Sequence, residues 1–395
     1  MHIAILGRQP ELGIAELERV FGGHSVTLPT PQIALVDCDD FNIQKFGGVP
    51  KAGKVIIELP KADWHQISQR IIQHYVSKWS SYEGKITLGI SVYDFNTSPR
   101  EVQKTGIILK QKLKKSGTSL RLVPNTDIAL NTATSHHNKL GLAANKVELL
   151  VVRANDGRAF VAESTGSQNI TAYARRDQER PKRDAFVGML PPKLAQIMIN
   201  LATSANLKSM VNGMPPTILD PFCGTGVILQ ESAIMGYVPY GTDLAKKMVD
   251  YSRTNLEWLA ETHHIKFDFR LHEGDAIDTK WQQPIDAVVG ETYLGQPFSA
   301  PPSPAKLEEV KKNCDRIITE FLKNIGKQIK PGTPICIAIP AWRDKEGRFT
   351  HLPLITTIAR LGYKPHEFMN VSQNDMLYYR EDQVVARELL VLTKL

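Results

Sequence analysis

The sequence predicts an α/β protein in which a doubly wound, mostly parallel sheet follows smaller α+β units. Two observations predict this fold class. From residue 217 onward, strand patterns alternate with glycine-containing turns and helix patterns, which is typical of parallel sheets. Residues 1–163 instead combine helix patterns with two strands that a short hairpin turn connects, which is typical of α+β layers.

Length and composition limit the class of protein. The 395 residues suffice for two or three domains that each bury a core. The apolar share of 42% and the charged share of 23% exclude a chain that is disordered throughout. No apolar run approaches 18 residues, and polar residues follow the first strand pattern at once. We therefore expect neither a membrane span nor a secretion signal, and we expect a cytoplasmic protein.

Metal sites and disulfides are not expected. The four cysteines, at 38, 223, 314 and 336, include no C-x-x-C pair. The histidine doublets at 136–137 and 263–264 lack a further ligand at metal-binding spacing.

The first half of the chain is predicted to contain two units. In residues 1–52 we expect strand 2–6, helix 11–21 and strand 33–37. In residues 53–165 we expect a β-α-β-α-β order with the helices on one face, followed by a hairpin at Asn155-Asp156-Gly157. The elements expected there are strand 55–59, helix 63–78, strand 86–93, helix 99–115, strand 119–123 and hairpin strands 147–153 and 158–163.

The second half is predicted to be one domain, 191–395, after a linker at 166–190. The segment 164–183 is polar and carries no convincing helix or strand pattern, which indicates the boundary. A helix begins after Pro191-Pro192, and a final antiparallel hairpin joins segments near 365–371 and 383–392. Between them we expect strands 217–220, 238–243, 267–271, 285–289 and 335–339 and helices 245–261 and 304–328.

The strongest indication of a ligand site is the segment Asp220-Pro221-Phe222-Cys223-Gly224-Thr225-Gly226 between a strand and a helix. A ligand can approach glycine backbone closely, and an acid at the strand end can bind a cationic amine but would repel phosphate. The segment therefore favours a cofactor that carries an ammonium group. Asp243 ends the next strand, where it would accept hydrogen bonds from ribose hydroxyls, and Asp275 follows the third, where it would accept from an adenine amine.

This segment resembles motif I of class I S-adenosylmethionine-dependent methyltransferases. With the opening Ile5-Leu6-Gly7-Arg8-Gln9-Pro10-Glu11-Leu12 and the Arg180-Pro181 step, the chain resembles THUMP-containing tRNA guanosine-N2 methyltransferases. The resemblance implies a ferredoxin-like domain at 1–52, a THUMP RNA-binding domain at 53–165 and a Rossmann-like catalytic domain at 191–395. It also implies methyl transfer from S-adenosylmethionine to the N2 amine of a tRNA guanosine, at position ten. The cofactor-binding residues that it implies are Asp220, Phe222, Gly224, Gly226, Asp243, Asp275 and Ala276.

The fourth strand departs from the family pattern. The family usually ends it with Asp-Pro-Pro-Tyr-Gly, whereas this chain has Glu291-Thr292-Tyr293-Leu294-Gly295. Glu291 keeps a carboxylate that would accept from the target amine and orient it. Leu294 can pack against a base but cannot stack as a ring would, a difference of roughly 1–3 kcal/mol, so Tyr293 would supply the stacking.

The charge distribution favours a polyanionic partner such as tRNA. The formal net charge is +7, and helix 99–115 is strongly basic. We expect this helix to present lysines away from an apolar side at Ile107-Ile108, and we expect the basic linker to add further phosphate contacts. The RNA-binding residues predicted in this way are Lys104, Lys112, Lys115, Arg175, Arg176 and Arg180.

Two other functions stay open beside tRNA guanosine methylation. One is methylation of another nucleic-acid amine, on an rRNA guanosine or a DNA adenine. The other is a non-catalytic tRNA-binding protein with a degenerate active site. Arg387 is given a structural role, paired on an edge strand. The sequence leaves open the number of methyl groups added and whether a small activating protein partner takes part.

Overall fold

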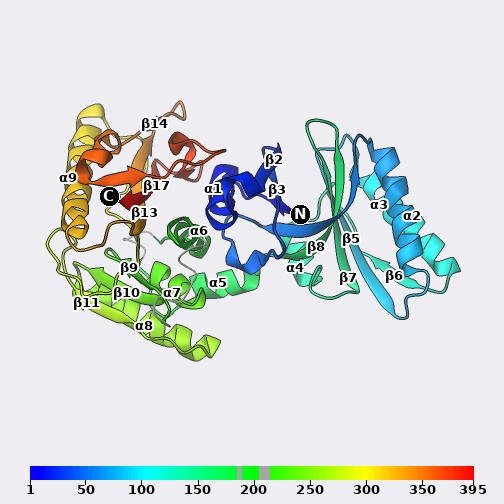
Figure 1. Cartoon of the computed structure of the whole chain (residues 1–395), viewed down its shortest axis with the longest axis horizontal. Helices are drawn as coiled ribbons and strands as arrows, with labels where there is room; N and C mark the ends of the chain where they lie inside the picture. The colour runs from blue at the N-terminus through cyan, green and yellow to red at the C-terminus, as the bar shows by residue number, and fades with distance from the viewer. Residues whose placement is uncertain (185–188, 204–213) are drawn as a thin grey trace. The chain divides into compact units, whose positions relative to one another are not determined.

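The computed structural model describes residues 1–184, 189–203 and 214–395 (Figure 1). It divides into two compact units. Unit 1 comprises residues 1–10 and 24–172, and unit 2 comprises residues 11–23 and 173–395. None of the described helices is long and apolar enough to cross a bilayer.

Unit 1 is built on an eight-stranded sheet with the order β2-β3-β1-β4-β8-β7-β5-β6. Its strands are β1 (His2–Ile5), β2 (Val26–Thr30), β3 (Ile33–Val36), β4 (Lys51–Leu59), β5 (Lys85–Tyr93), β6 (Ser119–Leu122), β7 (Lys146–Arg153) and β8 (Ala159–Ser167). Strand β5 runs parallel to β6 and β7, and the other pairs are antiparallel. Strand β4 pairs with β1 on one side and β8 on the other, so one sheet continues across the boundary expected at residue 52.

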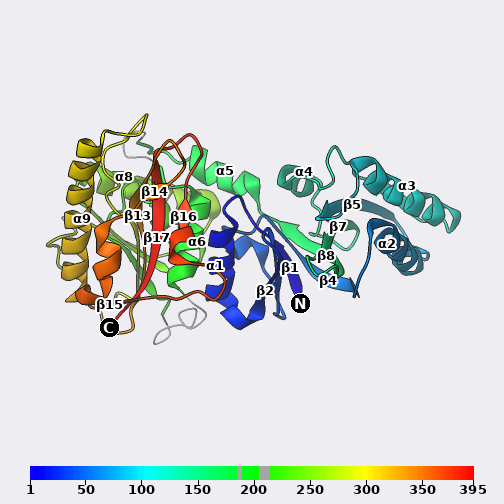
Figure 2. The ribbon, with the colours of Figure 1, turned by 90° about the horizontal axis from the view of Figure 1, so that it is seen from above.

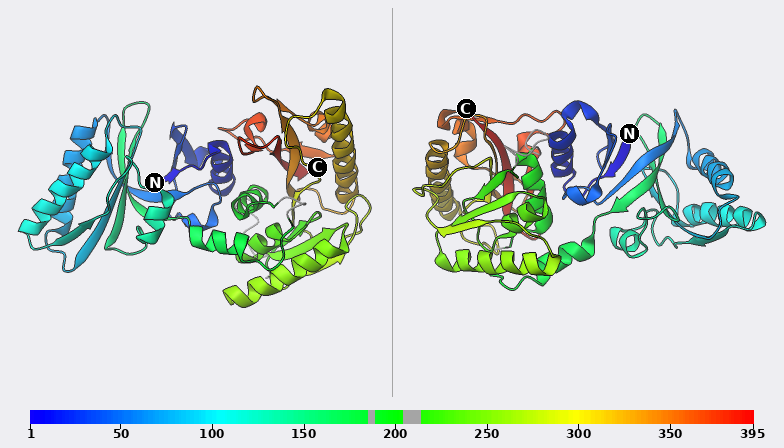
Figure 3. Two further views of the ribbon diagram at one scale, coloured as in Figure 1. Left: turned by 180° about the vertical axis from the view of Figure 1, so that it is seen from behind. Right: turned by 60° about the horizontal axis from the view of Figure 1, so that its bottom comes forward.

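Helices α2 (Trp64–Trp79) and α3 (Pro99–Lys115) pack on the same face of this sheet, as expected (Figure 3). Short helices η1 (Gly23–Ser25), η2 (Ile43–Lys45) and α4 (Thr132–His137) complete the unit. The predicted apolar side of α3 was half right, because Ile108 packs against the core while Ile107 is 43% exposed. The buried positions are instead Val102, Thr105, Leu109 and Leu113, whose spacing places Ile107 on the far side of the helix.

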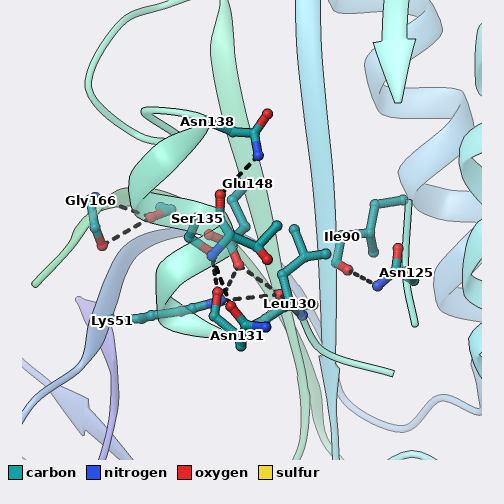
Figure 4. Close-up of polar contacts among 12 residues, drawn as sticks. Lys51, Ile90, Asn125, Leu130, Asn131, Ser135, Asn138, Glu148 and Gly166 are labelled. Carbon is teal, nitrogen blue, oxygen red and sulfur yellow. Dashed lines mark hydrogen bonds and ion pairs between the residues drawn. The ribbon is translucent and has the colours of Figure 1, made fainter. Parts of the chain in front are cut away.

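A buried ion pair joins β4 to β7 inside unit 1. Lys51 Nζ donates to Glu148 Oε1, and both side chains are buried. The same ammonium group donates to the carbonyl oxygen of Leu130 at 2.6 Å, and the Leu130 N–H donates to Ser91 Oγ at 3.0 Å (Figure 4). Because an unpaired buried charge is unfavourable, this network holds the loop before α4 against the sheet.

The predicted absence of structure between 164 and 183 was wrong. Strand β8 extends to Ser167, and helix α5 spans Ile170–Gln178. Apolar periodicity does not reveal α5, because the side chains it buries are Tyr173 and Arg176. The expected linker 166–190 also includes residues 185–188, which lie outside the described residues.

Unit 2 contains the predicted doubly wound sheet, with the order β11-β10-β9-β12-β13-β17-β15. Its strands are β9 (Thr217–Asp220), β10 (Val238–Asp243), β11 (Arg270–Glu273), β12 (Ala287–Glu291), β13 (Pro334–Arg343), β14 (Phe349–Thr350), β15 (Tyr363–Pro365), β16 (Leu377–Tyr378) and β17 (Val385–Lys394). Strands β11, β10, β9, β12 and β13 lie side by side and run parallel. Strand β17 runs antiparallel to β13 and β15. Strand β11 begins three residues later than predicted, and Phe267 and Phe269 of the preceding loop pack against the cluster of Cys223, Leu229 and Leu256.

Helices cover both faces of the sheet in unit 2. Besides α5, the described helices of this unit are α1 (Pro10–Phe21), α6 (Pro192–Ala202), α7 (Val227–Ile234), α8 (Lys246–His263), α9 (Pro304–Gly326), η4 (Pro353–Leu361) and η5 (Gln373–Asp375). Tyr240 belongs to the core under α9, whereas its neighbour Gly241 faces Leu229 of α7. Figure 2 shows α6 and α9 on opposite sides of β13 and β17.

Helix α1 packs within unit 2, although it follows the first strand of unit 1 in sequence. Its Glu18 carboxylate accepts the backbone N–H groups of Met369 and Asn370 at 2.7 and 2.9 Å. Arg19 donates to the carbonyl oxygen of Leu201 at 2.7 Å. The helix that the sequence assigned to a domain at 1–52 is therefore bound by polar contacts to α6 and to the loop after β15.

Candidate active site

A cavity of about 670 Å³ opens at the carboxyl ends of β9, β10 and β12. Strand β9 lies between β10 and β12, and the chain winds outward from it in both directions. Doubly wound sheets bind ligands at this switch point, outside the carboxyl ends of their strands. All the residues that line the cavity belong to unit 2.

The turn after β9 forms one wall of the cavity. Gly226 has a φ of +83° at the N-cap of α7, and a Cβ there would lie 2.8 Å from Ser252 Oγ, so the turn requires glycine. Helix α8 holds the turn from behind. Ser252 Oγ donates to the carbonyl oxygen of Gly224 at 2.9 Å, and Asn255 Nδ2 donates to that of Thr225 at 2.8 Å. The backbone that faces the ligand is thereby fixed by contacts on its far side.

Hydrogen bonds orient the three acids predicted for cofactor binding. Asp220 Oδ1 accepts the Phe222 N–H at 3.1 Å. Asp243 accepts from Gly224 and Ala245 with one oxygen each, both at 2.9 Å. Asp275 Oδ1 accepts the Ile277 N–H at 3.1 Å. Each carboxylate retains lone pairs for a ligand, because an ionised carboxylate can accept about four hydrogen bonds.

Burial makes the ionised forms of Asp220 and Asp243 unfavourable unless a cation lies nearby. Asp220 is 2% exposed, and burial raises its pKa well above the ordinary value, with the nearby Asp243 and Glu291 carboxylates adding to the rise. Burial also raises the pKa of Asp243. A positively charged ligand in the cavity would relieve this repulsion.

The end of β12 forms the wall opposite the turn. The N–H and Oγ1 of Thr292 both donate to the carbonyl oxygen of Ala338, at 3.0 and 2.9 Å, which holds the end of β12 against β13. Gly295 has a φ of +82°, and a Cβ there would lie 2.7 Å from Val310 of α9. Between these two residues, Tyr293 and Leu294 line the cavity. The Tyr293 residue is 41% exposed.

Glu291 lines the cavity and forms a buried ion pair with Arg387 of β17. Arg387 Nε donates to Glu291 Oε1. The sequence had paired Arg387 on an edge strand and assigned it no part in the site. Strand β17 instead lies inside the sheet, between β13 and β15, and the side chain reaches Glu291 at the cavity.

The structure brings nearly all the predicted cofactor and catalytic residues to this one cavity. Gly226 lies in the same turn but is not among the lining residues. The lining also includes residues that the sequence analysis did not assign to the site: Leu190, Val227, Ile228, Leu244, Ile277, Thr292, Arg316 and Ile317. Some of them carried a signal because they adjoin predicted residues, as Leu244 adjoins Asp243 and Thr292 adjoins Glu291. Leu190 and the α9 residues reach the cavity through tertiary packing.

The predicted RNA-binding residues divide into exposed and buried groups. Lys104, Lys112 and Lys115 are exposed on α3, and Arg175 is half exposed beside Glu179 on α5. The predictions for Arg176 and Arg180 were wrong, because both side chains are buried and unavailable to phosphate.

A buried carboxylate compensates the charge of Arg176, whereas Nε and Nη2 of Arg180 have no hydrogen-bond partner among the described residues. Arg176 donates to both carboxylate oxygens of Glu231, at 2.6 and 3.2 Å, and stacks on the ring of Tyr173. Arg180 lies 3.7 Å from Asp177, and burial lowers the pKa of its guanidinium.

Comparisons with known proteins identify relatives of this chain. The RMKL-like methyltransferase domain family matches residues 180–346. The tRNA (guanine(10)-N2)-dimethyltransferase of Methanothermobacter thermautotrophicus is 26% identical over 349 residues, which cover 88% of this chain and 90% of the relative. A relative from Methanothermococcus thermolithotrophicus, named probable tRNA (guanine(10)-N2)-dimethyltransferase, is 30% identical over 132 residues, which cover 32% of this chain and 73% of that protein.

A solved structure supports the fold along the whole chain. The crystal structure of TrmN from Thermus thermophilus aligns with a TM-score of 0.52 at 15% identity and covers 100% of this chain and 99% of its own. This likeness confirms the predicted α/β fold with a Rossmann-like methyltransferase domain. The family follows from the Methanothermococcus relative, which is 30% identical over 73% of its own length. The chain belongs to the tRNA guanine-N2 methyltransferase family.

Proposed function

We propose that this protein transfers methyl groups from S-adenosylmethionine to the exocyclic N2 amine of a guanosine in tRNA, at position ten. The observation that carries the proposal is a single cavity in which Asp220, Asp243 and Asp275 meet the Glu291 carboxylate at the switch point of the sheet. The names of the relatives supply the nucleotide and the amine. Because both relatives are named dimethyltransferases, we propose the dimethylated guanosine as the final product.

The residues of the cavity fit S-adenosylmethionine. The cavity volume of about 670 Å³ lies within the range of roughly 300–1,000 Å³ that is usual for ligand sites. Asp220 would accept from the ammonium group, Asp243 from the ribose hydroxyls and Asp275 from the adenine amine. The cofactor carries positive charge on its ammonium and sulfonium groups, which is what the buried acids require.

The chemistry needs an electrophilic methyl group and an oriented amine. S-adenosylmethionine supplies the methyl group on a sulfonium, so that a nitrogen–carbon bond can form as the carbon–sulfur bond breaks and the sulfur keeps the electron pair. Glu291 would accept a hydrogen bond from the amine, direct its lone pair and receive the proton that the nitrogen loses. Tyr293 would stack on the base, and Leu294 would pack against it.

The RNA contacts are proposed for exposed cations. Lys104, Lys112 and Lys115 lie on one basic helix, and Arg175 is exposed on α5. Such residues bind the phosphate backbone without reading sequence. The proposed setting is the cytoplasm.

The test is transfer of radiolabelled methyl from S-adenosylmethionine to unmodified tRNA transcripts, followed by nucleoside mapping. The wild type is compared with Asp220→Ala and Glu291→Ala, and with Asp286→Asn as a control at the opposite end of β9. We expect label on a guanosine N2 that the first two substitutions abolish and the third leaves unchanged. The same assay with rRNA or DNA in place of tRNA tests the alternative substrates, and label on an rRNA guanosine or a DNA adenine but not on tRNA would favour them.

The absence of methyl transfer would also be informative, because the binding properties of the protein then distinguish two explanations. If the protein binds both S-adenosylmethionine and tRNA without transfer, adding extracts fractionated by size tests for a small activating protein partner. If it binds tRNA but no cofactor, the protein is a tRNA-binding protein with a degenerate site.

A further inference from the structure

Sheet register places Arg387 and Glu291 on the same face of the sheet, one strand apart. Glu291 of β12 is opposite Ala338 of β13, and Arg387 of β17 is opposite Pro340 of the same strand. Residues 338 and 340 of a strand point to the same face, and directly opposed residues share a face. The arginine side chain therefore crosses β13 to reach the glutamate. The methyl side chain of Ala338 leaves room for this crossing.

The contact uses one of the two oxygens of the carboxylate. Arg387 Nε donates to Glu291 Oε1. Among the hydrogen bonds of the described residues, none reaches Oε2, and Glu291 lines the cavity. One oxygen is thus held by the sheet, and the second can serve a group bound in the cavity.

The charges around Glu291 explain why it needs this partner. The other ionisable groups lining the cavity are Asp220, Cys223, Asp243, Asp275, Tyr293 and Arg316, and Arg316 is exposed on α9. Burial raises the pKa of Glu291, and the Arg387 guanidinium opposes the rise through its charge and its hydrogen bond. The side chains of Glu291 and Arg387 are 15% and 10% exposed, so solvent screens the pair weakly.

We propose that Arg387 is a positioning residue for methyl transfer, which keeps the Glu291 carboxylate ionised and aims its Oε2 at the target amine. The proposal rests on the proposed function, because it assigns Glu291 to the amine. It also explains how a glutamate can replace the shorter, proline-flanked aspartate of the family. The longer side chain is held by a fixed cation instead of by rigid backbone.

The first test is the pH dependence of kcat/KM for tRNA methylation in the wild type, Arg387→Gln and Arg387→Lys. Loss of the cation should raise the pKa of Glu291, so that the active carboxylate forms only at higher pH. We expect the acid limb of the Arg387→Gln profile to move up by at least about one pH unit, which is a tenfold loss of rate on that limb. Arg387→Lys should move it less, and binding of S-adenosylmethionine should be unchanged in both.

Two controls separate positioning from folding. Arg348→Gln removes an exposed arginine of the same unit, whose side chain is 76% exposed, and should leave the profile as in the wild type. Thermal unfolding of each variant reports any loss of stability. A uniform loss of rate in Arg387→Gln, with the acid limb where the wild type has it, would show a merely structural arginine and overturn the proposal.

A second measurement does not depend on turnover. In protein labelled with ¹³C at glutamate carboxyl carbons, the Glu291 signal is assigned by its absence in Glu291→Gln and titrated by NMR. We expect a higher pKa for Glu291 in Arg387→Gln than in the wild type, and equal values would refute the role of Arg387. If the wild type methylates no tRNA even with the extract fractions added, the proposed function fails, while this titration still decides whether Arg387 controls the ionisation of Glu291.

Discussion

Replacing Asp220 with asparagine should weaken binding of S-adenosylmethionine and, at the same time, stabilise the ligand-free protein. Asp220 Oδ1 accepts the Phe222 N–H, and the amide oxygen of asparagine can accept the same bond. The substitution therefore keeps the shape of the turn and removes the charge. Its two effects have opposite signs, which a general disturbance of the site would not produce.

The structure sets the size of the first effect and the sign of the second. A hydrogen bond to a charged group contributes about 1.5–3 kcal/mol, so the Kd should rise roughly 10- to 150-fold. Burial raises the pKa of Asp220 in the folded protein. An acid with a raised folded-state pKa takes up protons on folding, so stability falls as the pH rises through the range between its unfolded and folded values. Asparagine removes this loss and should give a higher Tm at neutral pH.

The assay is calorimetric binding of S-adenosylmethionine together with thermal unfolding of the ligand-free protein at several pH values. The matched control is Asp286→Asn, because Asp286 Oδ2 accepts the Thr217 N–H at 2.7 Å, at the end of β9 away from the cavity. This control should leave the Kd unchanged. Wild-type affinity in Asp220→Asn, or a lower Tm at neutral pH, would refute the reasoning.

Three further outcomes follow from the buried and exposed cations. Lys51→Met should lower the free energy of unfolding by about 3–5 kcal/mol, measured by denaturant titration, because Glu148 stays buried without its partner; Lys51→Met combined with Glu148→Leu should recover most of the loss. Arg176→Ala should destabilise the protein by a similar amount through Glu231, while Arg175→Ala should leave the Tm unchanged. Replacing the three α3 lysines by glutamine should weaken tRNA binding and reduce its salt dependence by a slope of about 2–3, measured by fluorescence anisotropy at several salt concentrations.

The position of the residues proposed to bind the cofactor could be predicted from the sequence because their signals are local. Asp220 and the glycines after it are contiguous in the chain, and the strand–turn–helix pattern around them specifies where they lie. Asp243 and Asp275 follow the next two strands, and parallel strands end at the same edge of the sheet. Knowing the order of elements was therefore enough to bring these residues together.

The catalytic side depended on information that the sequence does not display. Arg387 and Glu291 are 96 residues apart, and their contact depends on the register of two strands against β13. The same limit explains the errors at Arg176 and Arg180. A cluster of basic residues in a sequence indicates side chains exposed to solvent or bound to phosphate, unless a buried acid is known to face them. The acid that faces Arg176 is Glu231, which lies on a different helix, 55 residues away. A charged residue within an apolar strand, such as Arg387 in β17, was the one available sign of a hidden partner.

The distribution of charge unites the two sides of the cavity. Glu291 has a resident cation in Arg387, whereas the hydrogen bonds to Asp220 and Asp243 from described residues come from backbone N–H groups. The compensated carboxylate is the one proposed to act on a neutral amine, and the uncompensated ones are those proposed to hold a cationic cofactor. If the arginine were paired with Asp220 instead of Glu291, its guanidinium would repel the cationic cofactor. Glu291 would then lack a cation and would take up a proton, so it could not accept from the amine. The placement of a single arginine thus distinguishes the acids proposed to bind the cofactor from the acid proposed to orient the amine.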